Sequence, residues 1–192
     1  MKITVTLNDH PIADSYWVQR GALLAGEYPG TLTDQETLQK LAALLDAGVT
    51  FFVDLTEQDE YGLRPYFLLA QQIAATRGQT LAHHRRSIPD MGVTTPAQLT
   101  AILDEIDAAL AQGQVVYVHC YGGIGRTGTV IGCWLVRHGQ TGEQALATIA
   151  ERRRNIPDGW RRSPETEAQI RMVLTWPAVK TANRRPHRRR SR

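Results

Sequence analysis

The residues whose types and spacing can do chemistry lie together in the stretch 115–129, VVYVHCYGGIGRTGT. Five residues, three of them glycine, separate Cys120 from Arg126. Successive backbone N–H groups in a glycine-rich loop form a concavity that binds anions, and glycine lets the chain turn tightly around the anion. The planar fork of Arg126 suits two phosphate oxygens. The stretch therefore predicts an oxyanion site.

Cys120 begins this loop, so its sulfur should lie beneath the bound anion. An apolar run precedes it and predicts a buried strand, and an apolar helix is expected to follow. A helix N-terminus and a nearby cation favour the thiolate form of a cysteine. A thiolate beneath a phosphate group is a nucleophile directed at phosphorus.

Three other interpretations of this stretch explain less. A structural buried cysteine accounts for neither the glycines nor Arg126. The spacing Gly123-x-Gly125-x-x-Gly128 matches a dinucleotide fingerprint, but that motif normally opens a fold and would leave Cys120 without a role. A Walker loop is excluded, because no Gly-Lys-Ser/Thr follows.

A thiolate that attacks a phosphate ester expels an oxyanion, which needs a proton from a general acid. Asp90 is the candidate, in the loop 87–95 that precedes Cys120 by about one strand and one helix. The alternative is that Pro-Asp-x-Gly only makes a turn. Asp59 and Glu60 can supply a second carboxylate, although we expect the polar loop 56–64 to be solvated.

The run Cys-x5-Arg-Thr, preceded by His, resembles the signature of cysteine-dependent protein-tyrosine phosphatases. The spelling HCYGGIGRTG is similar to the dual-specificity branch, including kinase-associated phosphatases, and IPDMG resembles the acid loop of that family. The resemblance implies that Cys120 is the nucleophile, Asp90 the acid, and Thr127 a donor to the sulfur, although Thr127 can also cap a helix. It also implies a set of phosphate-binding residues: Tyr121, Gly122, Gly123, Ile124, Gly125 and Arg126.

Supporting roles are implied for His119, which would orient the loop, and for Gln169, which would place water or substrate. Gln169 belongs to the stretch SPETEAQ, which resembles the segment that lines the pocket in related enzymes, together with Arg161 and Arg162. No metal or other cofactor is expected. The nearby His83 and His84 fit no structural zinc pattern, and we expect them at a strand end beside solvated charge.

The elements that must position these residues alternate along the chain. Apolar runs predict strands at 3–7, 16–18, 23–25, 49–55, 80–84 and 115–118, and periodicity and caps predict helices at 34–47, 65–77, 128–138 and 141–153, with others starting near 95 and 163. This alternation predicts an α/β fold with a central, mostly parallel sheet flanked by helices, as in a protein-tyrosine-phosphatase-like domain. The site should lie at the carboxyl ends of the strands.

Length and composition indicate the domain organisation and the expected location of the protein. The 192 residues and 42% hydrophobic content suit one domain, expected at 1–178, followed by an Arg-rich tail at 179–192 that we expect to be disordered. The net charge of +3 depends on this tail, since 184–192 holds six Arg and no acid. No run of eighteen apolar residues and no secretory leader is present, so we expect no membrane insertion. Two cysteines make no disulfide framework, which favours a cytoplasmic location; Cys133 is interpreted as core, with a regulatory partner of Cys120 as the alternative.

The sequence thus predicts a metal-independent phosphatase that acts through a cysteinyl-phosphate intermediate. The expected substrate and partner is a phosphorylated protein carrying phosphotyrosine, with phosphoserine or phosphothreonine left open. Two alternatives remain: a phosphate-reading binding module without turnover, and a phosphatase for a non-protein ester such as a phosphoinositide. Nucleic acid is not the expected partner, although the tail can make weak contact with it.

Overall fold

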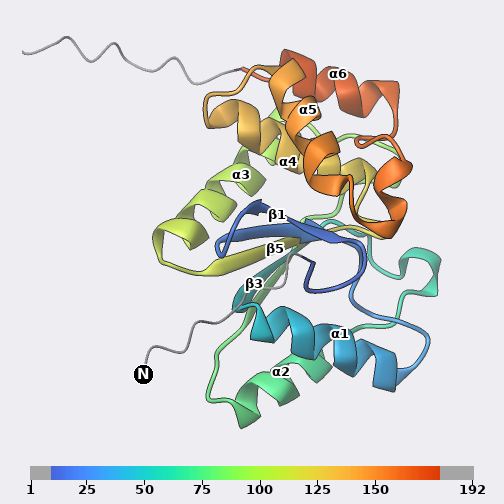
Figure 1. Cartoon of the computed structure of the whole chain (residues 1–192), viewed down its shortest axis with the longest axis vertical. Helices are drawn as coiled ribbons and strands as arrows, with labels where there is room; N and C mark the ends of the chain where they lie inside the picture. Colours follow the sequence, from blue (N-terminus) through green and yellow to red (C-terminus); the bar gives the residue numbers. More distant parts are fainter. Residues whose placement is uncertain (1–9, 178–192) are drawn as a thin grey trace, which may run out of the picture.

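A five-stranded sheet in the order β1-β2-β5-β3-β4 forms the centre of the computed structural model, which describes residues 10–177 (Figure 1). Its strands are β1 Ser15–Gln19, β2 Leu23–Gly26, β3 Val49–Asp54, β4 Ala82–Arg85 and β5 Val115–His119. β1 pairs antiparallel with β2, and every other pairing is parallel. The predicted α/β fold with a mostly parallel sheet is confirmed.

Helices cover both faces of the sheet (Figure 1). One face carries α1 Asp34–Asp46 and α2 Phe67–Thr76, and the other carries α3 Pro96–Ala111, α4 Gly125–Arg137, α5 Gly142–Arg153 and α6 Glu167–Thr175. Two short 3₁₀ turns, η1 Glu60–Gly62 and η2 Pro157–Trp160, lie in connections. Parallel strands need such crossovers, which is why strands and helices alternate in the sequence.

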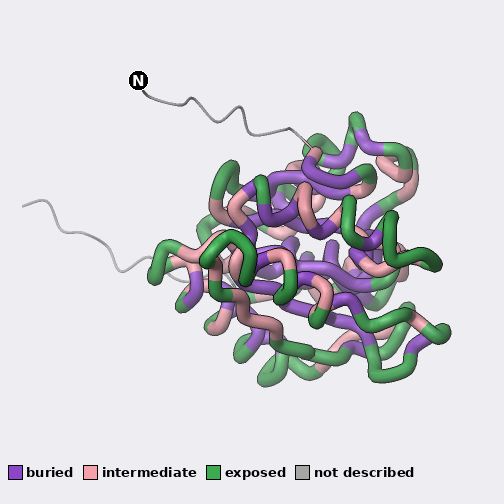
Figure 2. The backbone as a smooth tube through the Cα atoms, turned by 90° about the horizontal axis from the view of Figure 1, so that it is seen from below, coloured by how far each residue is buried: buried purple, intermediate pink, exposed green. Residues whose placement is uncertain are grey.

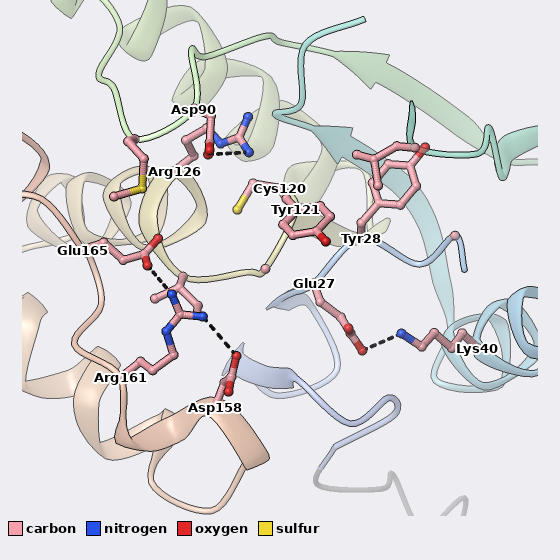
Figure 3. Close-up of a pocket in the computed structure, with 15 residues that line it drawn as sticks. Glu27, Tyr28, Lys40, Asp90, Cys120, Tyr121, Arg126, Asp158, Arg161 and Glu165 are labelled. Atoms are coloured by element: carbon pink, nitrogen blue, oxygen red, sulfur yellow. Dashed lines mark hydrogen bonds and ion pairs between the residues drawn. The ribbon is translucent and has the colours of Figure 1, made fainter. Parts of the chain in front are cut away.

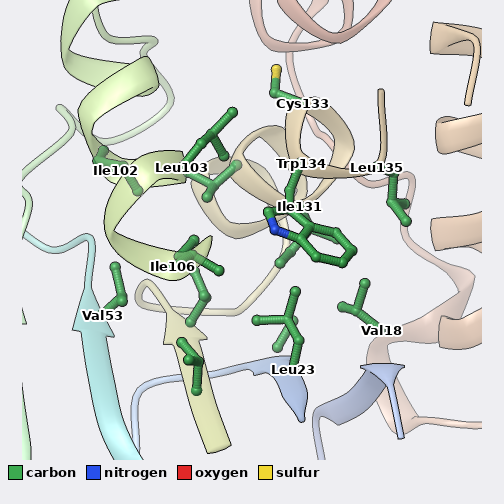
Figure 4. Packing of buried hydrophobic residues seen from close by; sticks show 14 of the residues in the cluster. Val18, Leu23, Val53, Ile102, Leu103, Ile106, Ile131, Cys133, Trp134 and Leu135 are labelled. Atoms are coloured by element: carbon green, nitrogen blue, oxygen red, sulfur yellow. The ribbon is translucent and has the colours of Figure 1, made fainter. Parts of the chain in front are cut away.

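The two faces of the sheet have separate apolar cores. Burial is concentrated in the strands and in α4, while the outer helices keep exposed faces (Figure 2). Every residue of α4 from Gly125 to Val136 is buried, since this helix lies between the sheet and α3, α5 and α6. Ile131 and Trp134 pack there near Leu103 and Ile106 of α3 (Figure 4). The α4 core therefore fixes the helix that begins at the glycine-rich loop.

Helix starts follow the predicted caps in most cases. Thr33, Thr95 and Thr141 each accept a hydrogen bond from the N–H three residues later. Two predicted starts are wrong. α4 begins at Gly125 rather than 128, and α6 begins at Glu167 rather than near 163 because Thr166 is its cap.

Two sequence predictions lie outside the described residues. The expected strand at 3–7 and the Arg-rich tail cannot be compared with the structure, and the domain boundaries at 1–178 and 179–192 stay predictions. Within residues 10–177, no helix is long and apolar enough to cross a membrane.

Candidate active site

The glycine-rich loop lies at the carboxyl end of β5, the middle strand of the sheet. β5 is flanked by β2 and β3, both parallel to it, so the turns that follow these strands meet beside Cys120. The Tyr28 N–H, just after β2, donates to the Tyr121 carbonyl at 2.8 Å, and the Leu55 N–H, just after β3, donates to the His119 carbonyl at 2.9 Å. The loop is thus fixed from both neighbouring strands.

The loop turns its carbonyl groups toward protein partners. Tyr121 accepts from Tyr28, Gly123 accepts from Arg153 at 3.0 Å, and the Ile124 carbonyl accepts from the Ser163 hydroxyl at 2.7 Å. In a trans peptide, the C=O of one residue and the N–H of the next point in opposite directions. The N–H groups of residues 122, 124 and 125 therefore point away from these partners, as an anion-binding nest requires.

A pocket of about 420 Å³ opens above this loop (Figure 3). The Cys120 side chain points into it, and the residue is only 3% exposed. Four acidic residues and three basic residues line the pocket: Glu27, Asp90, Asp158 and Glu165, with Lys40, Arg126 and Arg161. Lys40 pairs with Glu27 at 2.8 Å and Arg161 pairs with Glu165 at 2.6 Å, so most of the positive charge at the rim is already neutralised.

Arg126 is buried beneath the pocket and is held by a carboxylate that the sequence did not assign to it. Its two terminal nitrogens donate to the two Glu60 oxygens, both at 2.6 Å, and Nη1 also donates to the Ile88 carbonyl at 3.1 Å. Burial alone would lower the pKa of Arg126. The Glu60 hydrogen bonds and the charges of Cys120 and Asp90 outweigh burial and raise the pKa above its ordinary value, so the guanidinium stays charged. The Nε atom of Arg126 is buried and has no hydrogen-bond partner among residues 10–177.

The predicted solvated loop is wrong for Glu60. Glu60 is 9% exposed and lies in η1, whereas Asp59 beside it is exposed. Burial of the carboxylate is compensated by the bidentate bond to Arg126, which a sequence pattern cannot reveal because the two residues are 66 positions apart.

Asp90 lies at the mouth of the same pocket. Its Oδ1 is 3.0 Å from Arg126 Nη2, and its Oδ2 accepts a 2.7 Å hydrogen bond from the Tyr61 hydroxyl. The loop that carries Asp90 is anchored by the Ile88 N–H to the Leu55 carbonyl at 3.1 Å. The structure therefore brings Cys120, Arg126 and Asp90 together as the sequence predicted.

Thr127 follows Arg126 in the first turn of α4 and is fully buried. Its hydroxyl oxygen has no hydrogen-bond partner in the part of the chain that the structure describes. A buried hydroxyl without a partner is rare in folded proteins and usually indicates a partner that the bare chain does not supply. Ile124 rather than Thr127 occupies the N-cap position of α4, and no bond from Thr127 to the Cys120 sulfur is present, so the expected donation to the sulfur stays a prediction.

His119 is fully buried behind the loop and accepts a 2.6 Å hydrogen bond at Nε2 from the Tyr66 hydroxyl. Burial raises the pKa of Tyr66 well above its ordinary value. Its hydroxyl is the donor because His119 Nδ1 faces a carbonyl, which can only accept, and so Nδ1 rather than Nε2 carries the ring proton. Burial also lowers the pKa of His119 to about 4, although the charge of Asp54 opposes this shift. The neutral ring then carries its proton on Nδ1, which faces the Cys120 carbonyl at 3.4 Å. This arrangement is consistent with the predicted role in orienting the loop.

Gln169 is fully buried, and its amide is engaged at both ends. Nε2 donates to the Gly92 carbonyl at 2.9 Å in the Asp90 loop, and Oε1 accepts from the N–H groups of Glu165 and Thr166, both at 3.1 Å. The residue thus ties the acid loop to α6; its part in placing water or substrate stays a prediction. Of the two neighbouring arginines, Arg161 lines the pocket, whereas Arg162 is exposed and pairs with Glu167.

His83, His84 and the second cysteine lie away from the pocket lining. His83 and Arg85 contact buried Asp54, and His84 and Arg86 contact Glu105, so this strand end is paired rather than simply solvated. No group of residues within 10–177 is arranged to hold a metal ion. Cys133 is fully buried in α4, and burial raises the pKa of its thiol, which agrees with its interpretation as core.

Sequence reasoning missed the pocket residues supplied by other elements. Glu27 and Tyr28 could have been found, because they directly follow β2 and a parallel neighbour of β5 must end beside Cys120. Lys40 on α1, which lines the pocket, and Tyr61 in η1, which contacts Asp90, gave no signal, since neither belongs to a motif and both are placed by the packing of distant segments.

A family model described as "Polymorphic toxin system, DSP-PTPase phosphatase" matches residues 25–140, more than half of the chain. The chain belongs to this DSP-PTPase phosphatase family. The match spans the sheet from β2 to β5, the Asp90 loop and the whole of α4. The resemblance drawn from HCYGGIGRTG is confirmed at the level of the family.

Curated relatives of this DSP-PTPase domain match a shorter part of it. It is 44% identical over 70 residues to protein tyrosine phosphatase domain-containing protein 1 of Mus musculus, covering 34% of this chain and 9% of the relative. It is 32% identical over 72 residues to cyclin-dependent kinase inhibitor 3 of Sus scrofa, covering 36% of this chain and 34% of the relative. The chain therefore spans about a third or less of the length of these relatives.

A solved structure extends the similarity to most of the fold. A mutant form of Tk-PTP superposes with a TM-score of 0.63 at 25% sequence identity, covering 83% of this chain and 91% of that one. The DSP-PTPase fold of this chain is thus shared along nearly the whole of its described length.

Proposed function

We propose that this chain is a cysteine-dependent phosphatase that hydrolyses phosphotyrosine in proteins through a cysteinyl-phosphate intermediate. The observation that carries the proposal is the convergence of Cys120, Arg126 and Asp90 on one pocket above an inward-facing row of N–H groups. A phosphate group seated on those N–H groups would have the sulfur on one side and the Asp90 carboxyl near its ester oxygen.

In the first step, the Cys120 sulfur forms a bond to phosphorus as the ester P–O bond breaks. The bonding electrons pass to the leaving oxygen, which takes the proton of Asp90. The loop N–H groups and Arg126 stabilise the charge on the phosphoryl oxygens. The unpartnered Nε of Arg126 is free to bind this group while Glu60 holds the other side of the guanidinium.

In the second step, a water molecule gives a proton to the Asp90 carboxylate and bonds to phosphorus. The S–P bond breaks, and its electrons return to the sulfur. Thr127 can donate a hydrogen bond to the departing thiolate, which is a use for its buried hydroxyl. Inorganic phosphate then leaves.

The charge of the pocket supports a substrate with one phosphate group. Lys40 and Arg161 at the rim are each paired with a carboxylate, so little positive charge remains for a second phosphate. A phosphoinositide with several phosphates would need those cations free. Comparing kcat/KM for a phosphotyrosine peptide and a short-chain phosphoinositide tests this choice, and a higher value for the lipid would reverse it.

The proposed nucleophile is tested with Cys120→Ser and a small aryl phosphate. The serine hydroxyl is a far weaker nucleophile, while the anion-binding loop remains, so the variant should keep phosphopeptide binding and lose turnover. Residual activity above roughly a tenth of the wild type would rule out Cys120 as the nucleophile. Binding without turnover in the wild type would favour a phosphate-reading module instead.

The proposed acid is tested with Asp90→Asn on two substrates that differ in leaving group. An alkyl phosphate should slow by at least about 10²-fold, the lower range of general acid catalysis, and an activated aryl phosphate should slow much less. Equal losses on both substrates would place the acid elsewhere.

A further inference from the structure

The carboxyl group of Asp90 is held at both oxygens by two different elements. Oδ1 is 3.0 Å from Nη2 of Arg126 on α4, and Oδ2 accepts the 2.7 Å hydrogen bond from Tyr61 in η1. The Asp90 side chain is 34% exposed, so packing alone does not fix its direction. These two contacts therefore decide where the carboxyl group points.

Tyr61 reaches Asp90 from an unusual backbone conformation. Its φ of 48° and ψ of 22° lie in the left-handed region, which a bulky residue with a Cβ rarely adopts. The neighbouring Glu60 is buried against Arg126 and anchors the turn. One three-residue turn thus holds Arg126 through Glu60 and Asp90 through Tyr61.

The Tyr61 ring is 70% exposed, and its centroid lies 5.7 Å from that of Tyr121 on the phosphate loop. Burial of apolar surface is therefore a minor reason for its position, and the hydroxyl contact is the specific one. The hydrogen bond to Asp90 raises the pKa of Tyr61, so its hydroxyl stays protonated and acts as the donor.

A donor aimed at a carboxylate strengthens as negative charge develops on that carboxylate. When Asp90 passes its proton to the leaving oxygen, its O–H bond breaks, a new O–H bond forms on the leaving group, and the charge of the broken bond stays on Asp90. The groups that face this charge are Tyr61 and Glu60 from η1 and Arg126 from α4, with Cys120, Arg161 and Glu165 lining the same pocket.

We propose that Tyr61 is a positioning residue for catalysis, whose hydroxyl directs the Asp90 carboxyl into the Cys120 pocket and stabilises the carboxylate left by proton transfer. This inference rests on the proposed function, because it assigns a partner to the proposed acid. It makes η1 a part of the catalytic apparatus although none of its residues lies in the phosphate-loop motif.

The test removes the hydroxyl with Tyr61→Phe, which keeps the ring. With an alkyl phosphate, kcat should fall about tenfold, the order expected when one hydrogen bond to a charged group is lost, while KM stays nearly unchanged. With an activated aryl phosphate the loss should be smaller. The basic limb of the kcat/KM profile should move to higher pH, because a carboxylate that loses a hydrogen-bond donor holds its proton more tightly.

Two further variants keep the experiment decisive. Tyr61→Leu removes the ring as well and should resemble Tyr61→Phe on the alkyl phosphate if the hydroxyl is the active feature. Arg77→Ala breaks an exposed ion pair with Asp46 at the end of α2, away from the pocket lining, and should leave both kinetic constants and the pH profile as in the wild type.

Each outcome has one meaning. A Tyr61→Phe protein with wild-type alkyl-phosphate turnover and an unmoved basic limb overturns the inference while leaving the proposed function intact. A loss seen only in KM, or only with Tyr61→Leu, assigns the ring to substrate contact and also overturns it. If the wild type turns over neither substrate, the proposed function itself fails.

Discussion

Two buried guanidinium groups lie next to the phosphate loop and are stabilised in different ways. Arg126 is bound by the Glu60 carboxylate, whereas Arg153 of α5 is 1% exposed and donates to the carbonyls of Gly123 and Asp158. The Arg153 guanidinium also lies 5.9 Å from the centre of the Tyr16 ring. Carbonyl groups and an aromatic face solvate a cation without cancelling its charge. Arg153 therefore adds positive potential under the loop where an anion would sit.

Glu60→Gln should show how far Arg126 depends on its carboxylate. The amide keeps the shape of the side chain but removes the buried counter-charge and leaves only the partly exposed Asp90 beside the guanidinium. Breaking a buried ion pair typically destabilises a fold by roughly 3 kcal/mol. Phosphate in solution should restore more stability in this variant than in the wild type, because a bound anion would supply the missing charge. Thermal unfolding with and without phosphate measures both effects. A wild-type melting temperature in phosphate-free buffer would show that Glu60 does not compensate Arg126.

His119 should make stability depend on pH. Its pKa is about 4 in the folded protein and 6.5 in its ordinary state, so between these values the unfolded chain binds a proton that the folded chain excludes. The contribution of neutral His119 to the free energy of unfolding is fully present above pH 6.5. It is lost as the pH falls toward 4, by about 3 kcal/mol in all. Urea unfolding across this range measures it, and His119→Gln should flatten the slope. A wild-type free energy of unfolding that stays constant from pH 7 to 4 would contradict the buried neutral ring.

At the scale of elements, the loop between β5 and α4 is held in shape by its close approach to the end of β2. Gly123 has a φ of +68°, and a Cβ placed there would lie 2.3 Å from the backbone carbon of Gly26. That approach requires glycine both for its conformation and for its size. The two elements thus form one rigid support for the phosphate-binding N–H groups.

Gly123→Ala should therefore push the loop away from β2. We expect a loss of about 2 kcal/mol or more in the free energy of unfolding, because both the left-handed backbone and the backbone clash are penalised. Gly122→Ala is the matched control for stability, since its Cβ would meet only the Ile124 side chain, at an ordinary 3.8 Å. Equal melting temperatures for the two variants would show that the approach to Gly26 is not constrained.

The elements also show what the sequence could and could not predict. Strands, caps and the loop were readable because each depends on neighbouring residues: Thr141 and Gln144 cap α5, and the run before Cys120 forms β5. The start of α4 was misplaced because Gly125 is an unusual first helical residue. A Cβ there would lie 2.9 Å from the Glu165 side chain, and the Ile124 carbonyl before it accepts from Ser163. Glu60 was named as a possible second carboxylate, but its bond to Arg126 was not foreseen and Tyr61 was missed, because the partners of these residues are 66 and 29 positions away.

At the scale of the whole molecule, the site collects side chains from both layers of helices. α1 supplies Lys40 from one side of the sheet, while the segment between α5 and α6 supplies Asp158, Arg161 and Glu165 from the other (Figure 3). The proposed nucleophile and the phosphate-binding loop come from the middle, at the end of β5, and the proposed acid Asp90 comes from the loop between β4 and α3. A phosphorylated segment entering the pocket would therefore contact both layers of helices. We expect these surrounding residues, rather than the phosphate loop itself, to determine which substrate binds.

In the proposed reaction, the phosphoryl group is transferred first to the sulfur of Cys120 and then to water. Mixing the wild type with an activated aryl phosphate and quenching it in acid during turnover should trap that intermediate. Trypsin should release residues 87–126 and 127–137 as separate peptides, so Cys120 and Cys133 are distinguished by mass. We expect one added phosphoryl group on 87–126 and none on 127–137, with a stronger signal in Asp90→Asn, in which the second step lacks its base. If the wild type turns over the substrate and neither it nor Asp90→Asn carries a phosphoryl group on 87–126, Cys120 is not the phosphoryl acceptor.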